Sequence, residues 1–262
     1  MKIGDYVLVK NDKTGCIYRI KDIIEENKRI YLLFGVEFRI SRKEEENNLL
    51  PLSNDELQTV KSKIDKNEEN IKTKLLNNNV RNRKEKYLLG TIMHIDGDEE
   101  YLKKCLELYN EMGIYSYGKC IKEANICNQI GKCLLETNPD VVVVTGHDIY
   151  NNNGIKDINN YLNTKHFIKA VREIRKTKGN DCVVIAGACQ SNFEALIANG
   201  ADFASSPGRI NIHTFDPAII AINVVTTPIS SFVSKGDITK YIENANEAFG
   251  GLQTYGKMRL LF

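Results

Sequence analysis

The run Asp140-Val-Val-Val-Val-Thr-Gly-His147 contains four consecutive β-branched apolar residues. A continuous apolar run without alternation is typical of a strand in a parallel sheet that helices cover on both faces. The other apolar runs span 88–95, 114–117, 182–186 and 201–204. Amphipathic segments of helical period separate them, at 99–111, 122–136, 164–178 and 191–199. Strand–helix repeats of this size predict an α/β fold with a doubly wound, flavodoxin-like parallel sheet over residues 88–262.

The chain before residue 88 has a different pattern of apolar and polar residues. Short β-rich runs at 5–10, 16–24, 29–34 and 36–40 alternate with turn signals, which predicts a small SH3-like β-barrel over residues 1–50. Residues 51–87 are polar and predict a helical linker, in which Ser53 and Glu56 form a capping box. The tract Asn77–Lys86 carries several basic residues, and we expect either a plain connector or a site of self-cleavage near Arg81–Lys86.

The composition limits the classes of function. The 262 residues carry 36 basic and 34 acidic side chains, so the charge gives no reason to expect a nucleic-acid partner. The seven cysteines include no C-x-x-C pair, which argues against a disulfide framework and against a zinc ribbon. We expect no metal and no other cofactor. No secretory leader and no membrane span is predicted, and a cytoplasmic location follows as the default.

The most suggestive residue is Cys189, in Val183-Val-Ile-Ala-Gly-Ala-Cys-Gln190 at the end of a predicted strand. A strand-to-helix turn favours a thiolate, and the amides of Gly187 and Ala188 are candidates for binding an oxyanion. The alternative for Cys189 is a small buried core residue. His147 ends the neighbouring predicted strand, where an imidazole could act as the base for the thiol or could simply be a hydrogen-bonded structural residue.

Further polar residues follow the same strand ends. Asp96 and Asp98 could orient an imidazole or receive a guanidinium from a substrate, or they could cap the next helix. Asp148 could line an acidic substrate pocket or could simply cap the following loop, and Asp202 and Asp216 are equally possible as the acid of such a pocket. Ser205, Ser206 and Arg209 could bind the substrate backbone or could form a plain turn.

Two other classes of function remain open. Gly187-Ala-Cys-Gln-Ser191 also resembles the nucleophile elbow of class I glutamine amidotransferases and DJ-1-like enzymes, in which the histidine follows the cysteine; His213 would then be the base. A non-enzymatic, flavodoxin-like binding module that uses Asp96 and Asp98 is the third possibility, because a fold alone does not establish a function.

A histidine and a cysteine after neighbouring parallel strands resemble the dyad of the caspase–gingipain–legumain class of cysteine peptidases. That class usually has His-Gly, whereas this chain has Gly146-His147-Asp148. The resemblance implies a flavodoxin/caspase-like sheet. It also implies that the amide expected after the histidine, for the oxyanion, comes from Asp148.

Longer blocks resemble the YabG-type sporulation peptidases of spore-forming bacteria. They are the stretches that begin at His94, Val144, Ala186 and Ala204, together with Ile3-Gly-Asp-Tyr-Val7 and Phe34-Gly-Val-Glu-Phe-Arg39. The resemblance implies a sporulation endopeptidase that processes spore-coat and related proteins in the mother cell. It further implies a mechanism based on Cys189 and His147 and a preference for cutting after basic residues.

Overall fold

The apolar run that follows Asp140 forms β9 (Val141–Thr145), whose residues are all buried in the interior of a six-stranded sheet. The computed structural model describes residues 1–25, 28–77 and 86–261. We call the six-stranded sheet the main sheet, and its order is β12-β11-β10-β9-β7-β8. Its other strands are β7 (Ile92–Asp96), β8 (Ser116–Cys120), β10 (Val183–Ala186), β11 (Phe203–Ser205) and β12 (Phe249–Gly251).

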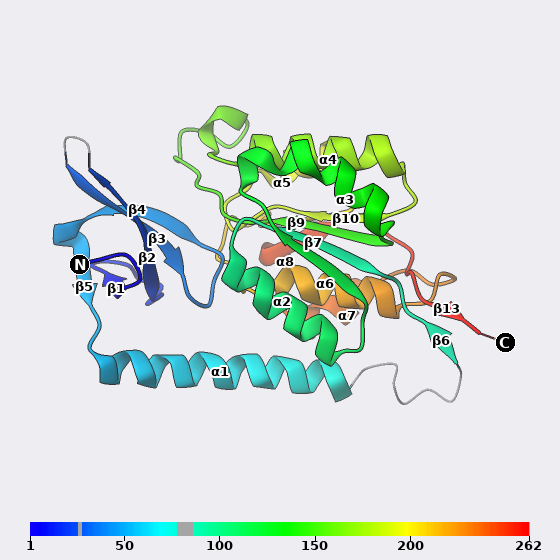
Figure 1. Ribbon diagram of the computed structural model, residues 1–262, viewed down its shortest axis with the longest axis horizontal. Helices are drawn as coiled ribbons and strands as arrows, with labels where there is room; N and C mark the ends of the chain where they lie inside the picture. The colour runs from blue at the N-terminus through cyan, green and yellow to red at the C-terminus, as the bar shows by residue number, and fades with distance from the viewer. Residues whose placement is uncertain (26–27, 78–85, 262) are drawn as a thin grey trace.

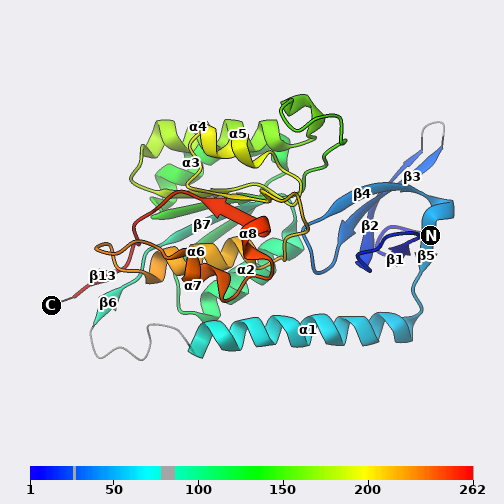
Figure 2. The same cartoon turned by 180° about the vertical axis from the view of Figure 1, so that it is seen from behind.

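Five strands of the main sheet run parallel in the order expected for a doubly wound fold, and β12 adds an antiparallel edge. Alternate residues of β9 face opposite sides, so that Val141 and Val143 join one apolar cluster and Val142 and Val144 join the other. Helices cover both faces (Figures 1 and 2). On one face lie α2 (Glu99–Glu111) and α6 (Asp216–Thr226); on the other lie α3 (Ile126–Thr137), α4 (Thr164–Lys178) and α5 (Phe193–Ala198).

A second, antiparallel sheet precedes the main sheet, and we call it the leading sheet. Its strand order is β4-β3-β2-β1-β5, with a register shift in β2 between Ile20 and Asp22. The strands are β1 (Tyr6–Val9), β2 (Tyr18–Glu25), β3 (Arg29–Gly35), β4 (Ser41–Glu45) and β5 (Leu49–Pro51), with a 3₁₀ turn at Glu46–Asn48. The prediction of a strand at 36–40 is wrong. That segment leaves the leading sheet and contacts the main-sheet region instead, through a bridge between Phe38 and His213.

The linker helix α1 (Asn54–Asn77) connects the two sheets along one side of the molecule (Figure 1). The predicted capping box is confirmed: the Glu56 carboxylate accepts from the Ser53 amide, and the Glu56 amide donates to Ser53 Oγ. Glu68 and Lys104 pair at 2.5 Å, which fastens α1 to α2.

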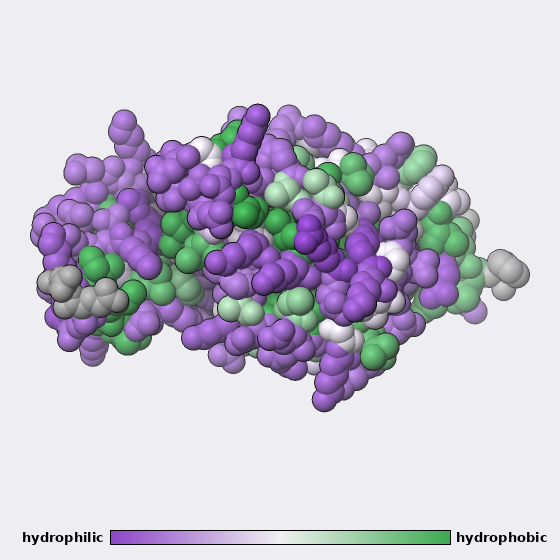
Figure 3. Space-filling model, turned by 90° about the horizontal axis from the view of Figure 1, so that it is seen from above, coloured by the Kyte–Doolittle hydropathy of each residue, from purple (hydrophilic) through white to green (hydrophobic). Residues whose placement is uncertain are grey.

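The chain after α6 was not predicted in detail. It forms two short helices and the edge strand β12, and its last strand pairs antiparallel with the strand that precedes β7. These elements are α7 (Lys235–Thr239), α8 (Ala245–Ala248), β13 (Arg259–Leu260) and β6 (Tyr87–Leu88), and two 3₁₀ turns elsewhere span Glu123–Asn125 and Ile158–Asn160. In the view of Figure 3, apolar side chains gather where the leading sheet meets the rest of the molecule.

Candidate active site

Cys189 lies in the turn between β10 and α5, where the sequence placed it. Gly187 makes this turn possible, because its φ is +109° and a Cβ there would lie 2.5 Å from Ser205 Oγ. The Cys189 side chain is fully buried, and its Sγ accepts the Ile212 amide at 3.2 Å. Burial raises the pKa of this thiol to about 12, although the Ile212 hydrogen bond opposes the shift. In this conformation Cys189 is therefore a protonated thiol at neutral pH.

His147 follows β9, and three neighbours fix its position. Its amide donates to Glu123 Oε1 at 2.8 Å, and its ring stacks on Phe34 of the leading sheet at a centroid distance of 3.6 Å. Its Nε2 lies 3.3 Å from Asp98 Oδ2, while the buried Nδ1 has no hydrogen-bond partner within the described ranges. A carboxylate at Nε2 favours the tautomer with the proton on that nitrogen, which leaves Nδ1 free to accept a proton.

The loops that carry Cys189 and His147 lie side by side, because β9 and β10 pair through Val144 and Ala186. Their side chains nevertheless do not meet. Within the part of the chain that the structure describes, no hydrogen bond or ion pair joins Cys189 to His147. The thiol is directed to Ile212 and the imidazole to Asp98, so an assembled dyad is absent from this conformation.

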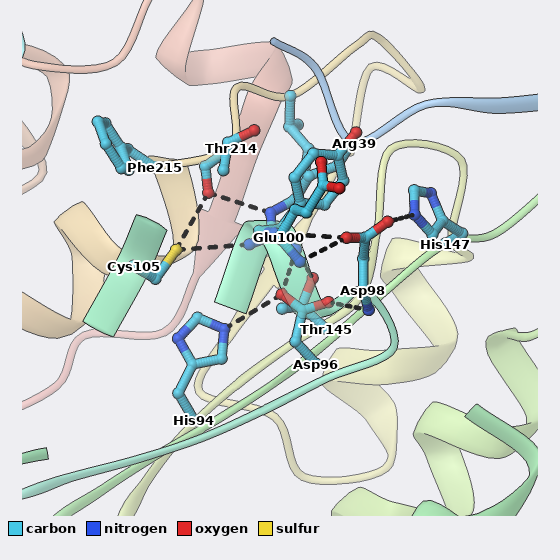
Figure 4. A network of polar contacts seen from close by, with 12 residues as sticks. Arg39, His94, Asp96, Asp98, Glu100, Cys105, Thr145, His147, Thr214 and Phe215 are labelled. Atoms are coloured by element: carbon cyan, nitrogen blue, oxygen red, sulfur yellow. Dashed lines mark hydrogen bonds and ion pairs between the residues drawn. The ribbon is translucent and has the colours of Figure 1, made fainter. Parts of the chain in front are cut away.

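Asp98 combines the two roles that the sequence left open. Its Oδ1 accepts from the amides of Glu100 and Tyr101, which caps α2, and its Oδ2 faces His147 (Figure 4). Burial is the largest single effect and would raise the pKa of Asp98, but the hydrogen bond and charge interaction with His147, the charge of Lys21 and the Tyr101 amide together outweigh it, so the pKa is lowered. Asp98 is therefore a charged residue that positions the imidazole.

Asp96 receives a guanidinium, but from the protein itself. Arg39 Nη1 lies 2.6 Å from Asp96 Oδ2, and both side chains are fully buried (Figure 4). Burial is the largest single effect and opposes the charge of Asp96, but the attraction of Arg39, with contributions from His94 and the Asp98 amide, outweighs it and lowers the pKa of Asp96. Arg39 was not among the site residues predicted from the sequence. The signal was a lone arginine within the apolar run Val36-Glu-Phe-Arg-Ile40, which is an unusual place for a residue that is rarely buried without a partner.

Asp148 lies behind the site rather than in an open pocket. Its carboxylate accepts from the amides of Ile149 and Asn163 and from the hydroxyls of Thr164 and Ser191. Burial is the dominant effect and raises its pKa to about 6. Asp216, which accepts from the His213 amide, is raised in the same way to about 7.

Of the three amides predicted to bind an oxyanion, those of Gly187 and Ala188 have partners in this conformation. The Gly187 amide donates to Val144 O at 3.1 Å, and the Ala188 amide donates to Ser191 Oγ at 3.0 Å. Ser205 Oγ donates to the carbonyl of Ala188, which supports the turn from behind. These contacts stabilise the backbone around Cys189.

Of the remaining predicted residues, two are separated from Cys189 by their contacts. Asp202 pairs with Arg175 at 2.5 Å and accepts the Val184 amide, so it lies toward the amino end of β10. Arg209 pairs with Glu194 at 2.9 Å on the outer side of α5. Ser206 donates to the Ile210 carbonyl and holds the turn that follows β11.

His213, the rival base, follows the residue that contacts the thiol. Its Nδ1 accepts the Phe215 amide at 3.1 Å, and its Nε2 lies 3.9 Å from Glu37 Oε1. Burial lowers the pKa of His213 to about 3. It is therefore a neutral imidazole, and no hydrogen bond links it to Cys189 in the described chain.

Two general features complete the description of the site. In residues 1–25, 28–77 and 86–261, no group of three or more His, Cys, Asp or Glu side chains is placed to hold a metal ion. Over the same ranges, no helix has the length and apolar character needed to cross a membrane.

The chain was compared with known proteins. The family model described as YabG peptidase U57 matches residues 2–262. The chain is 34% identical over 281 residues to the sporulation-specific protease YabG of Bacillus subtilis (strain 168), an alignment that covers 99% of this chain and 97% of that protein. No solved structure matches the chain.

Proposed function

Because the chain belongs to the YabG peptidase family, and is thus a sporulation-associated peptidase, we propose that it is a cysteine endopeptidase with Cys189 as nucleophile and His147 as base. The observation that carries this proposal is the placement of Cys189 and His147 on the loops that end the paired strands β10 and β9. Functional groups of parallel α/β sheets gather at this edge.

The contacts of His147 support its role as the base. Asp98 is charged and holds Nε2, which leaves the buried Nδ1 available for a proton. Nδ1 would take the proton from Sγ, and the thiolate would attack the scissile carbonyl to form a carbon–sulfur bond. The imidazolium would then give the proton to the leaving amine as the carbon–nitrogen bond breaks, and water would hydrolyse the thioester. For this step Sγ must leave the Ile212 amide and approach His147.

The oxyanion is the second requirement of acyl transfer. We assign it to backbone amides next to the two catalytic residues, with Asp148 in the place that follows the histidine and Gly187 and Ala188 before the cysteine. Since the Gly187 and Ala188 amides already have partners, the rearrangement that frees the thiol would have to free at least one of them as well.

We extend the proposal to architecture and specificity. The main-sheet region (88–262) would be a caspase-like peptidase domain, preceded by an SH3-like barrel (1–50) and a helical linker (51–87). Cleavage after basic residues fits the burial of a guanidinium against Asp96. Spore-coat and related proteins in the mother cell are the proposed substrates. The proposed self-cleavage near Arg81–Lys86 falls almost wholly outside the described residues.

The family assignment favours a peptidase over an amidotransferase or a binding module, but the identity of the base needs a separate test. His213 is the second candidate, because Ile212, its neighbour in the chain, contacts Sγ directly.

The test compares Cys189→Ala, His147→Ala and His213→Ala in the hydrolysis of a fluorogenic arginine peptide and of extracted spore-coat protein. We expect the first two to lose activity by on the order of 10⁴-fold, since members of a catalytic unit fail together. His213→Ala should retain it. His166→Ala, at a half-buried position of α4, and Cys182→Ala are matched controls. An active His147→Ala with an inactive His213→Ala would overturn the assignment of the base.

A further inference from the structure

The segment Val36–Ile40 leaves the leading sheet and lies across the carboxyl edge of the main sheet. Its backbone pairs with residues 212–214 in an antiparallel manner: the Arg39 amide donates to Ile212 O at 2.9 Å, and the Thr214 amide donates to Glu37 O at 3.0 Å. Phe38 lies between them and bridges His213. An extended peptide added to an exposed edge in this way is a general mode of peptide recognition.

The Arg39 side chain fills a pocket whose walls come from the main-sheet region. The contacts combine a charge pair, hydrogen bonds and the face of an aromatic ring, as a planar guanidinium requires. They are Asp96 Oδ2 at 2.6 Å, Thr214 O at 3.1 Å, Thr145 Oγ1 at 3.3 Å, Cys105 Sγ at 3.5 Å and the Tyr101 ring at 5.0 Å. No part of the Arg39 side chain is exposed. The pocket is therefore complementary to arginine in charge and shape.

The segment and the end of β3 that precedes it lie next to the two proposed catalytic residues. Ile212, whose carbonyl accepts from Arg39, donates its own amide to Cys189 Sγ. Phe34, at the end of β3 just before the segment, stacks on the His147 ring. Cys189 is fully buried and His147 is 3% exposed, so neither can meet an external peptide while β3 and the segment stay in place.

We propose that the peptide-binding groove of the peptidase is formed by residues 212–214 and the Asp96 pocket, and that Glu37–Arg39 of the same chain occupies it. Arg39 stands where a substrate arginine would bind, and the chain in this conformation is a latent enzyme. The inference that the chain is latent rests on the proposed function. The groove itself can be tested by peptide binding, which needs no catalysis.

The competing explanation is that Arg39 and Asp96 only fasten the leading sheet to the main-sheet region. The two explanations predict opposite results. If Arg39 and Asp96 only hold the two regions together, Arg39→Ala creates no binding site for an added peptide and does not raise activity. If Arg39 occupies the substrate groove, Arg39→Ala opens that groove to a peptide of the same sequence.

The first experiment measures binding in the inactive Cys189→Ala background. The probe is a fluorescein-labelled peptide that copies residues 36–41, Val-Glu-Phe-Arg-Ile-Ser, and the readout is fluorescence anisotropy. Arg39→Ala should lower the Kd at least about tenfold relative to Cys189→Ala alone, and the same peptide with alanine in place of arginine should not bind. An unchanged Kd for Arg39→Ala would overturn the proposal.

Arg42→Ala is the matched control, because Arg42 pairs with Asp12 and Glu44 inside the leading sheet. It should bind the peptide no better than the parent. Arg39→Ala leaves Asp96 buried without a cation, so its folding must be checked by circular dichroism. Should it not fold, Arg39→Lys, which keeps a cation beside Asp96, decides the question: a Kd several-fold below that of the parent supports the proposal, and an equal Kd overturns it.

The second experiment uses the active chain and a fluorogenic substrate, Val-Glu-Phe-Arg-aminocoumarin. Arg39→Ala should raise kcat/KM at least about tenfold over the wild type, whereas Arg42→Ala should leave it unchanged. Equal rates for the wild type and Arg39→Ala would overturn latency. If no variant hydrolyses the substrate but the binding difference holds, the groove assignment stands and the proposed catalytic site fails.

Discussion

Two pairs of buried acids surround the candidate site, and their pKa values move in opposite directions. Asp96 and Asp98 follow β7 and have lowered pKa values, whereas Asp148 and Asp216 have pKa values raised to about 6 and about 7. Burial alone would raise all four. The difference is that Arg39 and His147 face the first pair, while the second pair receives amide and hydroxyl donors.

This difference shows what keeps a carboxylate charged when it is buried near the edge of the main sheet. A carboxylate stays charged there when a guanidinium or an imidazole from elsewhere in the chain reaches it, and amide and hydroxyl donors alone do not compensate for the lost hydration. Because the cation beside Asp96 comes from the segment Val36–Ile40, which leaves the leading sheet between β3 and β4, the electrostatics of the site depend on how the two regions are joined.

The largest expected effect is that of Asp96→Asn. It leaves the Arg39 guanidinium buried without a counter-charge, which should lower the free energy of unfolding by about 3–5 kcal/mol. Urea unfolding at pH 7 measures it. Glu194→Gln, which breaks the more exposed pair with Arg209, is the control and should cost less than about 1 kcal/mol. Equal losses in the two variants would mean that the buried Asp96–Arg39 pair contributes no more to stability than an exposed pair does.

Asp148→Asn should become more stable relative to the wild type as the pH rises. With a pKa raised from 3.8 to about 6, the carboxyl binds its proton more tightly in the folded state. Its favourable contribution is therefore full below pH 3.8 and is lost as the pH rises through 6. Between pH 4 and pH 8, Asp148→Asn should gain about 2 kcal/mol relative to the wild type. A constant difference, measured by unfolding across this range, would contradict the raised pKa.

Asp98→Asn separates the two roles of Asp98. Asparagine caps a helix as well as aspartate does, so the stability should change little. We expect kcat to fall by about 10²-fold with little change in KM, because the imidazolium of His147 loses its carboxylate. Asp237→Asn, on α7, is the control, and an unchanged kcat for Asp98→Asn would leave Asp98 with a capping role only.

Lys21→Ala should have the smallest effect. Lys21 Nζ lies 4.0 Å from Asp98 Oδ2 but is 40% exposed, so water and salt screen the pair. The loss in unfolding free energy should stay below about 1 kcal/mol and should vanish at 1 M salt. A larger loss of unfolding free energy that persists in salt would show that an exposed cation can stabilise a buried carboxylate as strongly as a buried cation does.

Local pattern was sufficient for much of the main sheet. The helices at 99–111 and 164–178 have the predicted bounds, and the strand order that places Cys189 beside the loop of His147 was expected from the repeat of strands and helices. The helix predicted from residue 122 begins at Ile126, after a 3₁₀ turn. Such boundaries depend on only a few local hydrogen bonds.

The same local reasoning was wrong at 36–40, where an apolar, β-rich run predicted a strand of the leading sheet. The segment instead pairs with residues 212–214, about 175 positions away. Alternation of apolar and polar residues indicates that a segment is extended, but it does not indicate which part of the chain the segment will pair with.

By itself, the sequence determined the order of strands and helices and the edge on which Cys189, His147 and the paired acids gather, because these follow from local periodicity and from the parallel sheet that it implies. Only the tertiary structure decided that Arg39 enters the Asp96 pocket, that Phe34 covers His147 and that the thiol faces Ile212. The first two contacts depend on the packing of the leading-sheet region against the main-sheet region, and the third depends on how the chain after β11 folds back over Cys189. Each is a balance of burial and charge between distant segments that no local pattern records.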